Sequence, residues 1–240
     1  MKRLVIYVMY FMPFVCFSQV EKAIQAYKAQ DYQTALTEWN RLLDQNLKGA
    51  ELYYNIGNTY AGLKDFPHAI LFYRKALKWD PNCKACIKNL KIAETALGIE
   101  EINLPEFILF RFYKSILLTL QASHWFILYS VLLASAILIY FFNVRLATLQ
   151  IAIRYLALVS FVFLILALHR DHIRNEKNGF VLVKESALYL SPDQNSGKKI
   201  DLKPGQYLEI KDQIQGWIKV QTAELDFGWV ELNNGELVQL

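Results

Sequence analysis

The sequence YYNIGNTYAGLKDFPHAILFYRKALKWDP, residues 53–81, determines the architecture of the first third of the chain. Two small residues, Gly57 and Ala69, would let two helices approach closely, and tyrosines are available to fill the space beside them. Pro81 cannot continue a helix, so it marks where the second helix ends. The segment therefore predicts a pair of tightly packed antiparallel helices.

A second copy of this pattern lies 34 residues earlier, where Trp39 corresponds to Tyr73. A period of 34 residues is typical of the tetratricopeptide repeat, which is a helical pair of this kind. The residues that follow the signature order of the repeat are Tyr53, Ile56, Gly57, Tyr60, Ala69, Tyr73, Ala76 and Pro81. We predict a helical array over residues 19–98, with two repeats and a solvated capping helix at Lys84–Leu97.

The resemblance to tetratricopeptide repeats implies a groove, lined by the first helix of each repeat, that takes a peptide or another helix. The candidate groove residues are Tyr54, Asn55, Asn58, Ala61 and Lys88. Some relatives hold a terminal carboxylate with lysine and asparagine side chains. Here Val20 and Ile24 replace the polar residues of the first repeat, so a general peptide or helix groove is favoured over a carboxylate clamp.

Cys83 and Cys86 form a Cys-x-x-Cys pair just after the second repeat. In an oxidising compartment the pair would form a local disulfide, and the alternative is two structural thiols. Ile87 stands where a haem-attachment motif needs histidine, and two cysteines alone are too few for a zinc site. We expect no metal and no cofactor.

Residues 1–18 have the build of a secretory signal peptide. Lys2 and Arg3 precede the apolar run Leu4–Phe17, and small residues precede Gln19 at the positions that a signal peptidase reads. The segment is either cleaved there or kept as an anchor. In both cases the residues that follow are expected to be exported.

Two apolar segments, residues 124–142 and 151–168, are each long enough to cross the hydrocarbon layer as a helix, at about 27 Å. The short connection Asn143–Gln150 would make them antiparallel neighbours. Neither has an ionisable residue near its middle, which argues against a transporter or channel. Residues 105–122 predict a further helix that lies on the membrane surface or docks against the protein.

From residue 179 the sequence changes to short alternating runs separated by turns. The runs that predict strands are Phe180–Val183, Leu188–Leu190, Tyr207–Ile210, Trp217–Val220, Trp229–Leu232 and Leu237–Leu240. Residues 179–240 therefore predict a small all-β barrel. The segments Leu188–Pro192, Leu202–Gly205, Gly216–Val220 and Gly228–Val230 resemble the bacterial SH3 family, with a departure at Leu190, where many members carry arginine.

Alternation along these strands separates the barrel interior from its exterior. The inward set is Leu208, Ile210, Ile218, Val220 and Val230. The alternation places Trp217 and Trp229 on the opposite side of their strands from this inward set. They either close the ends of the barrel or form a ligand surface with Tyr189, Tyr207 and Phe227.

The order of signal, tetratricopeptide repeats, transmembrane hairpin and SH3-like domain resembles the BatE proteins of the Bacteroides aerotolerance (Bat) system. This resemblance implies the fold class, a multidomain chain of helical repeats, membrane hairpin and small barrel. It also implies partners, namely Bat membrane proteins with von Willebrand factor A domains and a MoxR-type ATPase. A role in aerotolerance or stress of the envelope is implied as well.

The modules predict a membrane-anchored protein-interaction scaffold of the cell envelope. Counting crossings places both soluble domains on the periplasmic side of a bacterial inner membrane. The alternative is a peptidoglycan tether that binds through the SH3-like domain. The chain has no phosphate-binding glycine loop and none of the common hydrolase motifs, so we expect no enzyme. A net charge of +4 without a basic tract argues against nucleic acid as a partner.

Overall fold

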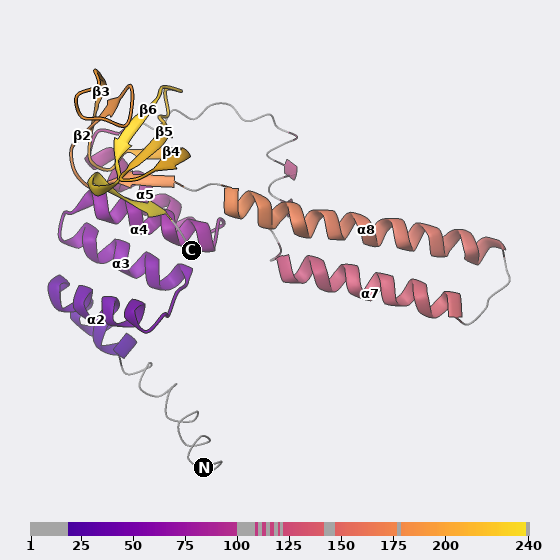
Figure 1. Cartoon of the computed structure of the whole chain (residues 1–240). Helices are drawn as coiled ribbons and strands as arrows, with labels where there is room; N and C mark the ends of the chain where they lie inside the picture. Colours follow the sequence, from indigo (N-terminus) through magenta and orange to yellow (C-terminus); the bar gives the residue numbers. More distant parts are fainter. Residues whose placement is uncertain are drawn as a thin grey trace, which may run out of the picture. The chain divides into compact units, whose positions relative to one another are not determined.

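The structure, a computed structural model, describes residues 19–99, 109, 112–113, 116–117, 120, 122–141, 147–176 and 179–238 (Figure 1). The predicted signal peptide and most of the predicted helix at 105–122 lie outside these residues. The chain divides into two compact units. One contains Met1–Ile102 and Asn178–Leu240, and the other is Asn103–Lys177. The predicted multidomain fold class, with helical repeats, two apolar helices and an all-β sheet, is confirmed.

The first unit begins with helices that alternate in direction as the repeat pattern predicts. Residues 19–28 are helical, and they are followed by α2 (Tyr32–Asp44), α3 (Ala50–Gly62), α4 (Phe66–Trp79) and α5 (Lys84–Ala96). Asp31 and Asp65, which are equivalent in the two repeats, each cap the next helix by accepting a backbone N–H three residues on. Gly98 ends α5 with φ +63°, a conformation that glycine adopts readily.

The small residues of the repeat lie where its helices touch. Ala35 and Ala69 are fully buried. A Cβ atom on Gly57 would lie 2.7 Å from ring carbons of Tyr73, which is closer than carbon atoms can approach without a shift. Gly57 thus allows the close packing of α3 on α4 that the sequence predicted.

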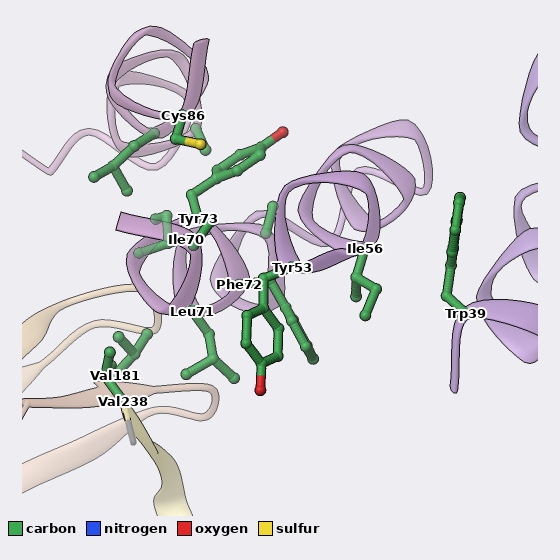
Figure 2. Close-up of a cluster of buried hydrophobic side chains, with 14 of the residues drawn as sticks. Trp39, Tyr53, Ile56, Ile70, Leu71, Phe72, Tyr73, Cys86, Val181 and Val238 are labelled. Atoms are coloured by element: carbon green, nitrogen blue, oxygen red, sulfur yellow. The ribbon is translucent and has the colours of Figure 1, made fainter. Parts of the chain in front are cut away.

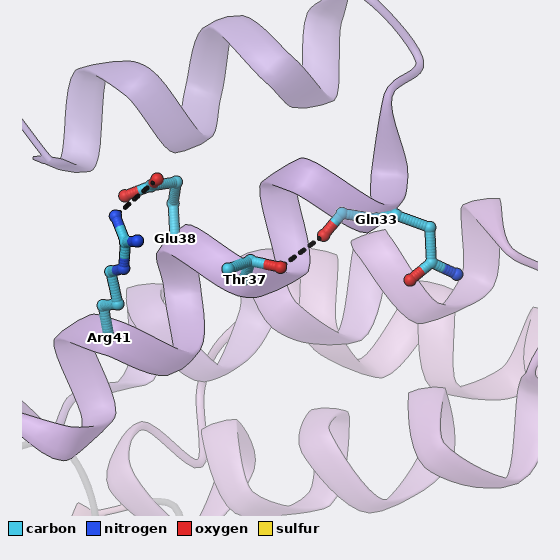
Figure 3. A network of polar contacts seen from close by, with 4 residues as sticks. All are labelled: Gln33, Thr37, Glu38 and Arg41. Atoms are coloured by element: carbon cyan, nitrogen blue, oxygen red, sulfur yellow. Dashed lines mark hydrogen bonds and ion pairs between the residues drawn. The ribbon is translucent and has the colours of Figure 1, made fainter.

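The surface of α2 carries contacts that are local to that helix (Figure 3). The Thr37 hydroxyl donates to the Gln33 carbonyl at 3.0 Å, and Arg41 pairs with Glu38 at 2.9 Å. Such contacts between residues three or four apart add little to stability and are ordinary for a solvated helix. We therefore assign α2 no separate binding role.

The C-terminal segment folds into an antiparallel sheet with strand order β3-β2-β6-β5-β4-β1-β7. Its strands are β1 (Gly179–Leu182), β2 (Ser186–Tyr189), β3 (Lys198–Leu202), β4 (Tyr207–Ile214), β5 (Trp217–Gln221), β6 (Phe227–Glu231) and β7 (Gly235–Val238). The predicted inward residues all lie within or against its apolar core. The sequence did not predict β3, because this edge strand is short and largely exposed, and its lysines obscure the alternation.

The sheet packs on the outer face of α4, a contact that was not predicted from the sequence. Val181 of β1 and Val238 of β7 belong to the same apolar cluster as Leu71 of α4 (Figure 2). All three side chains are buried. The described helical array ends at residue 99 and the sheet begins at residue 179. Two segments separated by 79 residues therefore share one core.

The second unit contains two long apolar helices, α7 (Ala122–Phe141) and α8 (Ala147–Glu176), which pack against each other. Trp125 stacks on Phe163 with ring centroids 5.6 Å apart, and its indole N–H donates to the Leu117 carbonyl at 3.3 Å. By length and composition, Ser123–Phe141 and Ile153–Arg170 could each cross a membrane. α8 extends beyond the predicted span of residues 151–168 at both ends.

Candidate partner-binding surfaces

A polar network joins α3, α4 and α5 at the predicted groove. The Asn58 carbonyl oxygen accepts from the Tyr73 hydroxyl and from the Asn89 amide, both at 2.8 Å. The Asn89 amide also donates to the Tyr54 hydroxyl at 3.3 Å. We call Tyr54, Asn58, Lys88 and Asn89 the α3–α5 surface.

The network determines which groups remain for a partner. Both acceptor positions of the Asn58 carbonyl are occupied, so its amide must face the other way. Within the described part of the chain, that amide donates to no protein atom and is not buried. The Tyr54 hydroxyl accepts from Asn89 and so keeps its own proton to donate. The α3–α5 surface therefore offers mainly hydrogen-bond donors, and Lys88, which precedes Asn89 on α5, is exposed.

Two tyrosines next to the α3–α5 surface, Tyr73 and Tyr27, have raised pKa values. Burial, the largest cause, raises the pKa of Tyr73, and its neighbours Tyr54 and Tyr27 raise it further. Burial also raises the pKa of Tyr27, together with nearby Tyr32 and Tyr54. Tyr73 and Tyr27 therefore add no phenolate charge beside the α3–α5 surface.

The other predicted groove residues differ in their placement. Ala61 is half-buried and lies one turn beyond Asn58 on the same side of α3. Asn55 is also half-buried, and its backbone carbonyl accepts from the Thr59 hydroxyl at 2.8 Å. Its side chain lies about a quarter turn away from Tyr54 around the helix.

Asn89 was not among the predicted site residues, although it donates to two of them. A signal was present, because Asn89 lies 34 residues after Asn55 and so occupies the equivalent position of a third period. The lysines of α5 predicted a solvated capping helix. Its inner side nevertheless contributes to the α3–α5 surface.

Four of the five aromatic residues predicted for the SH3-like ligand surface lie on neighbouring strands. We call Tyr189, Trp217, Phe227 and Trp229 the aromatic sheet surface. The rings of Tyr189 and Trp217 meet edge to face at 5.4 Å. Tyr189 is the cross-strand partner of Trp229, and Phe227 at the start of β6 is exposed.

Tyr207 does not join this aromatic sheet surface. Its position on β4 opposite Val181 turns it toward α4, where the guanidinium carbon of Arg74 lies 4.2 Å from the centre of its ring. Burial is the main cause that raises the pKa of Tyr207, and the nearby Arg74 charge partly offsets it. Sequence alternation could not reveal this, because it does not show what covers the outside of a strand.

Cys83 and Cys86 are joined by a disulfide, with Cα atoms 5.3 Å apart. Cys83 also caps α5, since its sulfur accepts from the Cys86 N–H at 3.2 Å. The bridge lies one to two turns before Asn89 and holds the start of that helix. Among the residues that the structure describes, no three histidine, cysteine or acidic side chains gather as a metal site.

Comparison with known proteins agrees with the repeat architecture. Residues 50–83, which span α3, α4 and the turn after them, match the sequence model of the tetratricopeptide repeat. Among curated proteins, none matches the chain. Residues 50–83 are thus a tetratricopeptide repeat, a module that indicates a role in binding other proteins.

Proposed function

We propose that the protein is a membrane-anchored protein-interaction scaffold of the bacterial cell envelope. The observation that supports this most directly is the α3–α5 surface. Its two donors are the Tyr54 hydroxyl proton and the Asn58 amide, which donates to no protein atom among the described residues, and hydrogen bonds to half-buried Asn89 and buried Tyr73 hold these side chains in position. Donors that are already oriented lose little conformational entropy when a partner binds.

The chemistry of the α3–α5 surface suits an extended segment of a partner protein. Carbonyl oxygens of such a segment would accept from Asn58 and Tyr54, and an acidic group would pair with Lys88. Ala61 leaves room beside them for a partner side chain. These hydrogen bonds depend on the backbone of the partner more than on its amino-acid sequence, which suits a scaffold.

Three features support a place in the envelope, with both soluble parts in the periplasm. α7 and α8 would anchor the chain, and an even number of crossings returns it to its starting side. The Cys83–Cys86 disulfide suits an oxidising compartment. Residues 1–18 resemble an export signal.

By its resemblance to BatE, the chain would hold Bat proteins with von Willebrand factor A domains, linked to a MoxR-type ATPase and to aerotolerance.

Capture from detergent-solubilised membranes tests the scaffold. We expect Lys88→Glu to lower the recovery of envelope proteins several-fold, because it reverses the charge on the exposed residue next to Asn89. Lys48→Glu, an equal charge change at an exposed loop, is the matched control. Asn58→Ala should act in the same direction as Lys88→Glu. Equal recovery with all variants would exclude the α3–α5 surface as the binding site.

A peptidoglycan tether is the second candidate, and the aromatic sheet surface favours it. Tyr189 and Trp217 meet edge to face and, with exposed Phe227, could pack against sugar rings or peptide stems. Sedimentation of the full chain in detergent with purified sacculi tests this. Phe227→Ala should lower this binding, and Leu190→Ala, at an exposed apolar residue just after β2, should leave it unchanged. No co-sedimentation would leave only the scaffold.

A further inference from the structure

The contact between the sheet and α4 has an apolar centre. Leu71 projects from the outer face of α4 toward Val181 and Val238 (Figure 2). Leu71 and Val181 are fully buried, and Val238 is 3% exposed. Without the sheet, Leu71 would be an exposed leucine on the outer face of α4. Its burial here depends on strands that follow α8 in the sequence.

Charged side chains of α4 surround this centre and contact the sheet. Arg74 lies over the Tyr207 ring, Lys75 pairs with Glu236 at 3.2 Å, and Lys78 donates to the Val238 carbonyl at 3.2 Å. Arg74 also pairs with Glu94 of α5 at 2.7 Å, where both side chains are mostly buried. Three consecutive contacts along α4 therefore fix the sheet, and one of them continues into α5.

The same contact closes the end of the array. A Cβ atom on Gly205, in the turn between β3 and β4, would lie 2.5 Å from a side-chain carbon of Leu97 just after α5. In the repeat pattern α5 is the first helix of a third pair. Lys91 occupies the position of Gly57, so a second helix could not pack closely there. Solenoid arrays need such terminal caps.

We infer that the C-terminal sheet caps the helical array, so that residues 19–99 and 179–238 form one obligate folding unit. α5 carries both Asn89 and Glu94, so the cap also holds the helix that completes the α3–α5 surface. If α7 and α8 span the membrane, which rests on the proposed function, the unit forms only when both segments lie on one side. The connection between α7 and α8 then lies on the opposite side.

Chemical cross-linking in the full chain tests the cap. Lys75→Cys and Glu236→Cys are introduced together, with Cys16→Ser to remove the one cysteine outside the disulfide, and a protease site is inserted between α7 and α8. A short bifunctional thiol reagent is applied to membranes before cleavage. The two halves should stay joined on a denaturing gel. With the control pair Lys75→Cys and Asp212→Cys, the halves should separate.

Two further measurements separate the cap from the membrane anchor. Alkaline carbonate washing of the same membranes reports anchoring. If the chain stays in the membrane but the Lys75→Cys and Glu236→Cys pair fails to hold the two halves together, the cap alone is overturned. A chain that is washed off but stays cross-linked overturns the anchor alone. A chain that ends at Glu176 should show at least tenfold faster amide exchange in α4 and α5, and unchanged exchange there overturns the cap.

Discussion

Replacing Leu71 by alanine should weaken the sheet as well as the helix that carries the residue. Leu71 is fully buried between α4 and the two strands that contain Val181 and Val238. Substitutions of this kind in a packed core cost about 2–5 kcal/mol. Val181→Ala removes two carbon atoms and should cost about 1.6 kcal/mol before any cavity remains, at about 0.8 kcal/mol for each.

The combination of both changes is more informative than either alone. Residues in contact typically couple by about 0.5–3 kcal/mol, and the two changes empty the same space, so the second should cost about 1 kcal/mol less than it does alone. The matched control combines Val181→Ala with Leu42→Ala, a change at a buried leucine of α2. The control pair should be additive to about 0.5 kcal/mol.

Urea unfolding of the full chain in detergent, monitored by near-ultraviolet circular dichroism, gives these free energies. Hydrogen exchange shows where the loss occurs, and we expect faster exchange in β1 and β7 when Leu71 is changed. Additive Leu71 and Val181 changes, together with unchanged exchange in the strands, would refute a shared core. The shared core would also be wrong if the array and the sheet unfolded at clearly different urea concentrations.

Three further predictions test single features of the fold. Gly57→Ala should lower the free energy of unfolding by about 1–3 kcal/mol, because the added carbon meets the Tyr73 ring, and thermal unfolding measures the loss. Asp65→Ala should cost about 1 kcal/mol in the same assay, because it removes the cap that accepts from the His68 backbone N–H. Raising the pH should destabilise the protein, because Tyr73 and Tyr207 have raised pKa values in the folded state. As the pH rises, the unfolded state loses these protons first. The stabilisation from the two neutral tyrosines is therefore fully present below a pH of about 10 and is lost above it. Urea midpoints measured across this pH range would show the loss.

The sequence predicted most of the helical array because its signals are local. Small residues 34 apart mark the contacts between helices, Pro81 marks a helix end, and alternation marks the inside of the sheet. Each depends on neighbours within one or two helical turns or along one strand. The α3–α5 surface was found in part, because helical spacing places Tyr54 and Asn58 on one side of α3.

The features that could not be predicted involve contacts between residues far apart in the chain. Asn89 completes the polar network from α5, Tyr207 turns toward Arg74 instead of joining the other aromatic residues, and Leu71 is covered by strands more than 100 positions later. Periodicity shows that a face is apolar, but it does not name the element that covers it. That choice depends on shape and charge across the whole unit, so the sequence determined the modules and the folded chain determined how the helices and the sheet join.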